Sequence, residues 1–582
     1  MPRIDELPDY RAKLPRNVHD LSHKFGFTAT VAHLMPVFHD FLNAGETVEL
    51  GFNYNLRTQP LQSAAMVDIK AHVEYFFVPM FLLYEPFGTM YYNISDNYSS
   101  LIPYNNSANP VQKVFPVLDM TQFKADMLSY DTDNIDFEDW CNHAYRLMDL
   151  IGFNNTNLNT SPQGWNPNVF PYQLLAYHCI YQYYYRLDNR ESFNQQTFNW
   201  DKYYNTPLVT LTSAEYKSLF RLHYRPKDSD YFTDIKISPI VDVLNLNVKN
   251  SFDMANQFLT RPNSGSLSVL TSGGVGSSSS VVNGAPSKSN NPSTSIQTNV
   301  GFRADLSSSG MTGDYIAKNG LDINTANIRA MFATEKLLSV TGRARKHYDD
   351  QTLAHFGVKV PHDPKHEISC FGHDRSQIHI GEVISTADTA NAALGEIAGK
   401  GYSQLSSKPH KFTAPCHGVV MAILSFVPDI TYGGELFPKF NVMTSREDLY
   451  TPEYDHLGMQ PLFEYEAFAN SGSTILGWQY RYEQWKRRYN RVSKAFSGSG
   501  NLDSWMLDFS PYTQNGGVIH DEIDFLHSPS ELNQIMLVPY VTTLPSSDET
   551  KTYDGDPFVV DGFIHCKKVS TMSDYSLPRL DA

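Results

Sequence analysis

The sequence predicts a mainly β protein, a single antiparallel sandwich whose connections between strands carry large helix- and loop-containing insertions. Two segments near the amino terminus, 48–56 and 67–77, alternate apolar and polar residues. A period of two is typical of a half-buried strand. Other strand-like segments return only after residue 378, and helical or polar stretches lie between. Because strands at both ends of the chain are hard to divide into successive domains, one sandwich with insertions is the simpler arrangement.

The early strands have the clearest pattern. Apolar residues take every second position from Val48 to Leu56, and the pattern repeats from Val67 to Phe77. A weaker strand, 25–31, precedes both, and the turn-forming residues 43–45 separate it from the second strand.

The middle of the chain mixes helices with long polar stretches. Residues 171–187 predict a helix that opens on a proline and is rich in tyrosine, which suits a partly exposed, partly packed surface. From 263 to 300, Ser, Gly, Asn, Thr and Pro dominate and Lys288 is the only charged residue. This composition is typical of a flexible or irregular surface loop. A further helix begins near Thr325 and ends in the basic tract 343–347.

Strand patterns resume in the last third of the chain. The predicted late strands are 378–384, 418–427, 535–541 and 558–569. We therefore expect an amino-terminal arm over residues 1–24 and one sandwich domain over 25–582, with an insertion over about 80–365.

Composition limits the function classes. Hydrophobic residues make up 41% and aromatic residues 13% of the 582, which suffices for a packed core and for large interfaces. The net charge of -16 is opposite to that of a free nucleic-acid binder, whose affinity comes from neutralising phosphates. Any DNA contact needs a local basic patch or a separate basic partner.

The cysteines and the amino terminus indicate a compartment. Five widely spaced cysteines form no Cys-x-x-Cys pair, which favours a reducing compartment with inert buried thiols: Cys141, Cys179, Cys370, Cys416 and Cys566. Residues 1–16 lack the apolar core of a signal peptide, and no run approaches the length of a membrane span. We expect a product of the cytoplasm with no membrane insertion.

One segment near residue 485 combines cations with aromatic rings. Rings stack on unpaired bases while arginine and lysine bind phosphates, so the segment is a candidate DNA-facing patch. A contact between subunits or a solvated face are the alternatives. The candidate residues are Arg481, Trp485, Lys486, Arg487, Arg488, Arg491 and Lys494. The tract 343–347 is a poorer candidate, since helix ends commonly carry cations.

No catalytic, cofactor or metal site is predicted. Imidazole and thiolate groups favour zinc, but the spacing of the following residues matches no zinc-site template, and ordinary loop and strand histidines are the preferred interpretation: His362, His366, Cys370, His373 and His379. Cys416 and His417 are neighbours in a predicted strand and face opposite sides, which argues against a catalytic pair. The acids Asp521, Glu522 and Asp524 fit solvated turns better than a carboxylate pair or a calcium site.

Several segments, taken in order, resemble the major capsid proteins of microviruses, particularly the gokushovirus-like branch. The early ones end in Phe-Phe-Val-Pro, the central ones contain His-Phe-Gly, and the late ones combine aromatic and basic residues. The segments are 25–31, 34–36, 44–47, 74–79, 327–330, 336–338, 355–358, 412–426, 477–491 and 502–505. They span nearly the whole chain in the expected order, which is more specific than any single motif.

This resemblance implies an eight-stranded jelly roll, the β-sandwich of viral capsids, and a structural role without enzyme activity. It further implies that many copies close into a small icosahedral virion shell around circular single-stranded DNA, assembled in a bacterial cytoplasm. The implied partners are an internal scaffolding protein, a DNA-pilot protein, a small basic DNA-packaging protein and a host surface receptor. Residues 190–324 match little, and in the family such a region is a variable insertion that projects outward.

Two other classes remain open on the residues alone. A β-rich carbohydrate-active enzyme would use exposed aromatic residues to stack on sugars and a carboxylate pair to cleave the bond, but no such pair is identifiable. A phage fibre or adhesin subunit predicts trimers and internal repeats, and the sequence has no repeat of fixed period. The state of assembly separates the three classes.

Overall fold

The structure is a computed structural model of the whole chain. The chain divides into two compact units, Met1–Pro239 with Val358–Ala582, and Ile240–Gly357. The second unit lies inside the region predicted as an insertion. The residues that the structure describes are 15–58, 66–84, 86–92, 115–119, 146–152, 168–186, 208–226, 228, 230–232, 234–236, 267–270, 281–282, 301–304, 325–345, 347–384, 397–429, 431–433, 439–443, 445–455, 458–467, 475–496, 502, 505–506 and 557–573.

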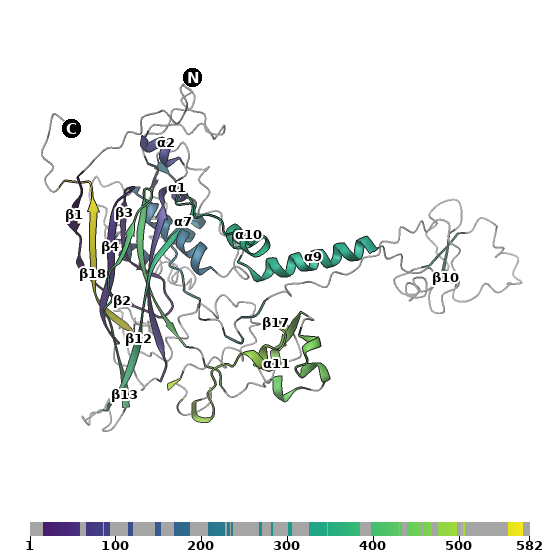
Figure 1. Cartoon of the computed structure of the whole chain (residues 1–582). Coiled ribbons are helices and arrows are strands. Elements are labelled where there is room, and N and C mark those ends of the chain that lie inside the picture. The colour runs from purple at the N-terminus through teal and green to yellow at the C-terminus, as the bar shows by residue number, and fades with distance from the viewer. Residues whose placement is uncertain are drawn as a thin grey trace, which may run out of the picture. The chain divides into compact units, whose positions relative to one another are not determined.

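A large antiparallel sheet of ten strands forms the body of the first unit (Figure 1). Its strands are β1 (Asn17–Asp20), β2 (His23–Ala29), β3 (Met35–Leu42), β4 (Thr47–Thr58), β5 (Ile69–Pro79), β12 (Ser369–Ile384), β13 (Ile397–Leu405), β14 (His410–Thr413), β15 (Gly418–Pro428) and β18 (Phe558–Ser570). Hydrogen bonds join them in the order β1-β18-β4-β13-β12-β5-β15-β3, with β2 beside β18 and β14 beside β4. This confirms the mainly β, antiparallel class, while the eight-stranded count stays a prediction.

β12 bends the sheet, because it changes partner along its length. Its first part, 369–378, pairs with β5, and its second part, 379–384, pairs with β13. A bulge between Cys370 and Gly372 shifts the register of the first part. Strands that change partner through bends or bulges make the corners of β-sandwiches.

Side chains from β4 and β18 meet those of β5 and β15 in one apolar core. The rings of Phe426 and Phe558 lie with centroids 4.6 Å apart. The backbone N–H of Phe52 donates to the buried hydroxyl of Tyr75 at 2.9 Å, which joins β4 to β5 through the core. The alternation predicted over 48–56 therefore reflects the burial of one face of β4.

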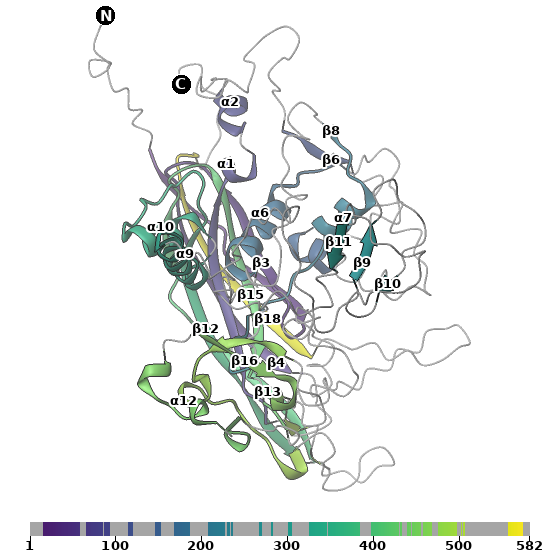
Figure 2. The same ribbon diagram turned by 90° about the vertical axis from the view of Figure 1, so that its right-hand side faces the viewer.

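β5 and β15 are buried on both faces. Successive residues of β5 alternate between two cores, with Phe77 in the first and Phe76 in the second. The helix α6 (Tyr172–Ile180) packs on both strands over the second core (Figure 2). It continues as a π-helical turn, Tyr181–Tyr185. Most of the predicted tyrosine-rich helix is thus buried, with Tyr184 exposed as expected for a mixed surface.

The remaining elements of the first unit are short. They include α1 (Met80–Leu83), α2 (Phe87–Tyr92), α7 (Ser213–Leu219) and a small sheet of β6 (Val117–Asp119), β7 (Asn168–Val169) and β8 (Leu208–Val209). Within the part of the chain that the structure describes, no helix has the length and apolar character needed to cross a membrane.

The second unit contains two helices and a small sheet. α9 (Thr325–Arg343) begins where the sequence predicts, and α10 (Tyr348–Phe356) follows it. The Gln351 side chain of α10 donates to the carbonyl of Thr341 at 3.0 Å, which holds the two helices together. The three strands are β9 (Leu267–Leu270), β10 (Val281–Val282) and β11 (Gly301–Ala304). Two of them fall in the stretch 263–300, where composition predicted only a loop.

We call α9 and α10 the helical arm, and its large apolar side chains are exposed. In α9, Phe332 is 59% and Leu337 55% exposed; in α10, Phe356 is 79% exposed. No described residue of α10 is buried. A helix whose apolar residues are not covered by the described residues of its own unit indicates an interaction surface.

The cysteine prediction holds in part. Cys179, Cys416 and Cys566 are free and buried, as expected. Cys370 is free but exposed, because it faces outward beside the bulge in β12. Cys141 lies outside the described residues, as does the predicted strand 535–541.

Candidate nucleic-acid interface

The candidate patch follows a small hairpin along the chain and lies on a turn, a short helix and the segment after it. β16 (Met459–Phe463) and β17 (Ile475–Tyr480) pair antiparallel, and a short helix, α12 (Glu483–Lys486), comes next. Between β17 and α12, Tyr482 has φ 61°, a left-handed backbone conformation that residues other than glycine rarely adopt. Its buried hydroxyl donates to the carbonyl of Glu447 at 3.2 Å, which helps to hold this reversal of the chain.

Backbone hydrogen bonds join the hairpin to two segments that are distant in sequence. Lys236 and Trp478 exchange two N–H···O bonds, both of 2.8 Å. The N–H of Tyr432 donates to the carbonyl of Asn490 at 3.0 Å, and the N–H of Val492 donates back to Tyr432 at 2.8 Å. Residues from three parts of the chain therefore form one site.

A cluster of aromatic rings forms the floor of this site. The ring centroid of Phe232 lies 5.0 Å from that of Tyr231, 4.8 Å from that of Tyr432 and 4.9 Å from that of Tyr489. The Tyr432 hydroxyl donates to Asp230 at 2.7 Å. These contacts hold the rings against one another, so the half-buried ring of Tyr489 lies at the surface on top of packed aromatic side chains.

Arg487 is bound by two carboxylates. Its Nη1 lies 2.6 Å from Asp234 and its Nε lies 2.7 Å from Glu483. The hydrogen bond to Asp234 raises the pKa of the Arg487 guanidinium above its ordinary value. This cation is therefore largely neutralised within its own chain.

Arg481 and Lys486 are also near acids. Arg481 lies 3.9 Å from Glu447, and Lys486 lies 3.8 Å from Asp455. Lys486 further donates to the carbonyl of Arg481 at 2.8 Å. Such pairs at a surface are weak, but they reduce the positive charge that remains for a phosphate.

Arg488 and Arg491 differ from the other cations, because both are exposed and neither has a carboxylate within 4.0 Å in the described chain. The guanidinium of Arg488 lies 4.7 Å from the ring centroid of Phe440. The exposed ring of Trp485 meets the same phenylalanine edge-on, with centroids 5.0 Å apart. Lys494 is exposed at the end of the segment. The predicted patch therefore contains cations that are paired with carboxylates and two arginines without such a partner among the described residues, Arg488 and Arg491, which we call the open arginines.

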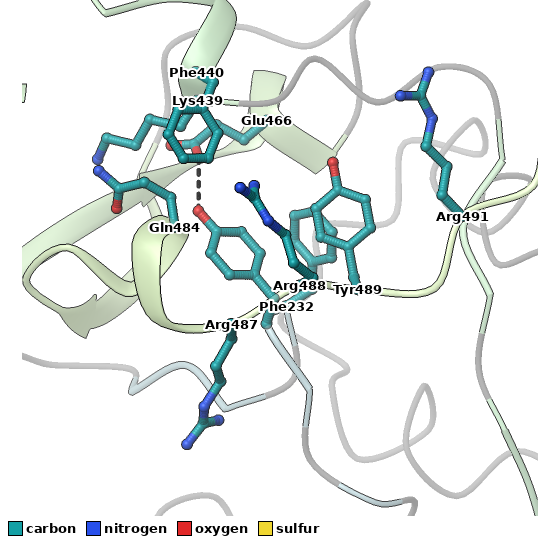
Figure 3. A pocket seen from close by; sticks show the side chains of 10 residues that line it. Phe232, Lys439, Phe440, Glu466, Gln484, Arg487, Arg488, Tyr489 and Arg491 are labelled. Carbon is teal, nitrogen blue, oxygen red and sulfur yellow. Dashed lines mark hydrogen bonds between the residues drawn. The ribbon is translucent and has the colours of Figure 1, made fainter.

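A hollow of about 210 Å³ opens beside these arginines (Figure 3). In this view Arg488 points in among the lining side chains, whereas Arg487 points away from them. The hollow is lined by Tyr231, Phe232, Lys439, Phe440, Glu466, Gln484, Arg487, Arg488, Tyr489 and Arg491.

Three polar residues of this hollow were not selected from the sequence: Lys439, Glu466 and Gln484. Burial lowers the pKa of the Lys439 ammonium, and Glu466 opposes that shift. Burial raises the pKa of the Glu466 carboxyl, against the hydrogen bond that its carboxylate accepts from Tyr231. Lys439 and Glu466 belong to segments with no marked pattern, so only the fold brings them to the basic segment.

The histidines weighed as metal ligands do not gather at one place. His362 lies beside Glu367, and His366 Nδ1 lies 2.7 Å from Asp363. His373 instead meets two residues of β5, His72 and Glu74.

Ligand atoms of this second group lie within 4.8 Å of one another. However, Arg225 donates to both oxygens of Glu74, at 2.8 and 3.2 Å, so a cation already occupies that carboxylate. Burial lowers the pKa of His72 to about 4, and it shares a hydrogen bond of 3.0 Å with His373. The group is accounted for as a hydrogen-bonded network around the partly buried ion pair of Arg225 and Glu74.

Cys416 and His417 make contacts with different residues. The Cys416 thiol donates to the carbonyl of Pro364 at 3.0 Å, and burial raises its pKa to about 11. The His417 ring packs against Phe87 and Tyr91. Both residues lie just before β15 and not within a strand, so the predicted reason for separating them, opposite faces of one strand, is wrong, although their contacts differ. The acids at 521, 522 and 524 lie outside the described residues.

Two comparisons with known proteins cover this site and nearly all of the chain. The model of a family described as capsid protein (F protein) matches residues 10–131 and 145–549. The capsid protein VP1 of Chlamydia phage 1 is 24% identical, over 99% of this chain and 97% of that relative. Both matches include the hairpin, the ring cluster and the open arginines.

Proposed function

Because the chain belongs to the capsid protein (F protein) family, its role is structural, and we propose that copies of it close into a small icosahedral shell around a circular single-stranded DNA genome. Membership of this family confirms the resemblance to microvirus capsid proteins and assigns the chain to the virion. A closed shell requires each copy to present several different contact surfaces to its neighbours.

The observation that supports self-assembly best is the helical arm. Its exposed Phe332, Leu337 and Phe356 side chains are typical of a surface that another molecule covers. α9 carries Arg329, Lys336 and Arg343 against Glu335, and α10 adds Asp349 and Asp350, so the two helices together have no net charge. Because the arm carries no net charge, a second copy of this acidic chain can cover it without repulsion between like net charges.

Light scattering and negative-stain imaging of the purified chain test the proposal. We expect uniform closed particles when single-stranded DNA and the co-expressed internal proteins are present. A chain that stays monomeric or trimeric under every condition contradicts the proposal and favours the enzyme or the fibre.

We propose that the face bearing Arg488 and Arg491 contacts the packaged DNA. Two exposed arginines without carboxylate partners, next to exposed Trp485 and half-buried Tyr489, match the pairing of cations and rings that binds single strands. The overall negative charge confines such contacts to a local patch. A contact between subunits is the alternative use of the same surface.

Replacing both arginines by alanine should weaken the binding of single-stranded DNA and lower its salt dependence. Each lost phosphate contact removes about 0.7 from the slope of log K against log salt, so the double variant should lose roughly 1.4. Fluorescence anisotropy of a labelled oligonucleotide at several salt concentrations measures this. The control is Lys400→Ala with Lys411→Ala, which removes the same charge from exposed positions on β13 and β14. Equal slopes in the two double variants would place the DNA contact elsewhere.

The internal and host partners of the shell are proposed from the resemblance to microvirus capsid proteins. We propose an internal scaffolding protein, a DNA-pilot protein and a small basic DNA-packaging protein, the last because an acidic shell leaves much of the genome's charge unneutralised. Assembly would take place in the host cytoplasm, and residues 25–582 would act as one capsid domain behind the arm 1–24. The variable region 190–324 would contact the host surface. Unchanged adsorption after deletion of 263–300 would argue against that last role.

A further inference from the structure

The hollow beside the basic segment contains a buried polar group that the described chain leaves unsatisfied. Gln484 is 3% exposed, and its Oε1 accepts a hydrogen bond from Gln460 at 2.7 Å. Its Nε2 amino group has no hydrogen-bond partner among the described residues. Buried amide donors are nearly always bonded in folded proteins, so this one indicates an acceptor other than the described residues.

Glu466 adds an acceptor to the same hollow. It is 1% exposed, and its oxygens accept from the Tyr231 hydroxyl and the Phe463 N–H, both at 3.3 Å. Each carboxylate oxygen has more than one lone pair, so both retain capacity for a further donor. A donor and an acceptor that line one small hollow are suited to the edge of a polar heterocycle.

Aromatic rings supply the walls, and the size limits the occupant. Tyr231, Phe232, Phe440 and Tyr489 all line the hollow. Its volume of about 210 Å³ is below the range of roughly 300–1,000 Å³ typical of pockets for drug-sized ligands. One planar ring system therefore fits, while the rest of a larger ligand must stay outside.

The charge around the hollow favours an anionic ligand. Lys439, Arg488 and Arg491 line it together with Glu466, and Arg487 is already bound by its own carboxylates. Three cations against one acid attract a ligand that carries negative charge next to its planar ring. A neutral sugar can stack on the rings but offers no charge to the cations.

From these observations we infer that the hollow holds one unpaired nucleobase of the packaged strand. The base stacks against the rings, its edge accepts from Gln484 and donates to Glu466, and the adjoining phosphates lie on Arg488 and Arg491. The inference rests on the proposed contact with DNA and adds that the contact includes a base. A nucleobase with its phosphates can bind the unsatisfied amide, the rings and the cations together. An acidic side chain of a second copy would bind only the cations.

Binding of two labelled oligonucleotides to the full-length chain tests the inference. One is a short homopolymer with bases, and the other is an abasic strand with the same number of phosphates. We expect the intact strand to bind roughly tenfold more tightly, because stacking is lost with the base. Gln484→Leu should remove a large part of this difference and leave the affinity for the abasic strand unchanged. Gln404→Leu, at an exposed position on β13, is the matched control and should change neither.

A second variant tests the same inference if Gln484→Leu does not fold. Phe440→Leu shortens a partly exposed ring and should lower only the affinity for the intact strand. Equal affinities for the two strands in the unaltered chain would overturn the base pocket, while a salt-dependent affinity that falls in the double arginine variant would keep the DNA contact. Absence of binding by both strands removes both proposals. A change in particle size in the Gln484 variant, with unchanged DNA binding, would instead assign the hollow to a contact between copies.

Discussion

The double variant Phe332→Asp with Phe356→Asp should prevent closed shells from forming while the chain itself still folds. Both rings belong to the helical arm and are exposed in the single chain, so their replacement removes no packing within it. In an assembled shell the same positions would place unpaired charges in an apolar contact, and hot-spot residues of this kind cost about 2 kcal/mol or more each. Because every contact is repeated throughout a closed shell, the loss should be close to complete.

Particle size by light scattering and unfolding by circular dichroism measure the two halves of this prediction. The matched control is Thr334→Asp with Ala354→Asp, which adds the same charge at exposed, non-aromatic positions of the same two helices. We expect the control to assemble. If the aromatic double variant also forms normal shells, the arm does not join the copies.

Lys568→Met should lower the free energy of unfolding by about 3–5 kcal/mol, because it removes the cation from a buried cluster of charges. The Lys568 ammonium on β18 lies 3.1 Å from Asp40 and 3.5 Å from Glu46. Glu46 is 3% exposed and accepts a further bond from Ser570 at 2.6 Å. Methionine fills the space of the lysine stem but leaves both carboxylates without their cation.

The pKa of Glu46 sets the pH at which this loss is largest. Burial raises that pKa, but hydrogen bonds from Ser570 and Asn43, with the charge of Lys568, lower it below its ordinary value of 4.5. A lowered pKa means that the carboxylate stabilises the fold above pH 4.5 and that this contribution is lost as the pH falls further. The penalty of Lys568→Met should therefore be fully present at pH 7 and shrink in acid.

Urea unfolding at pH 7 measures the effect, and the neighbouring residue provides the control. Lys567 lies on the same strand but points to the exposed face, so Lys567→Met should change stability by less than about 0.5 kcal/mol. Adding Glu46→Gln to Lys568→Met should recover part of the loss, since it removes one uncompensated charge. Similar losses in the two lysine variants would show that the cluster contributes little.

The strands that were predicted correctly are those in which the pattern of apolar and polar residues follows the burial of the strand. β4 and β18 bury one face and alternate, whereas β15 is buried along its whole length and appears as an unbroken apolar run. β3 was missed, because Pro36, His39 and Asp40 interrupt any apolar pattern. Asp40 is tolerated there because Lys568 reaches it from the other end of the chain. A contact of that range leaves no local pattern in the sequence.

The candidate interface shows the same division between local and distant information. The alternation of cations and rings near residue 485 selected a segment that lines a hollow in the fold, and its use as an interface stays a prediction. It did not distinguish Arg487, which Asp234 neutralises, from Arg488, which has no such partner in the described chain. The acids that decide this come from segments whose proximity only the fold establishes, and Glu466 was missed for the same reason.

The position of β18 has a consequence for the timing of synthesis. β18 lies between β4 and the two early strands β1 and β2, so β4 gains this partner only after β18 has left the ribosome. At roughly 5–20 residues per second, β4 waits on the order of 25–100 seconds for that strand. A nascent or truncated chain keeps an open edge at β4 throughout this interval. Only a chain translated through β18 closes this edge, so the order of strands couples completion of the sheet to the synthesis of a late strand.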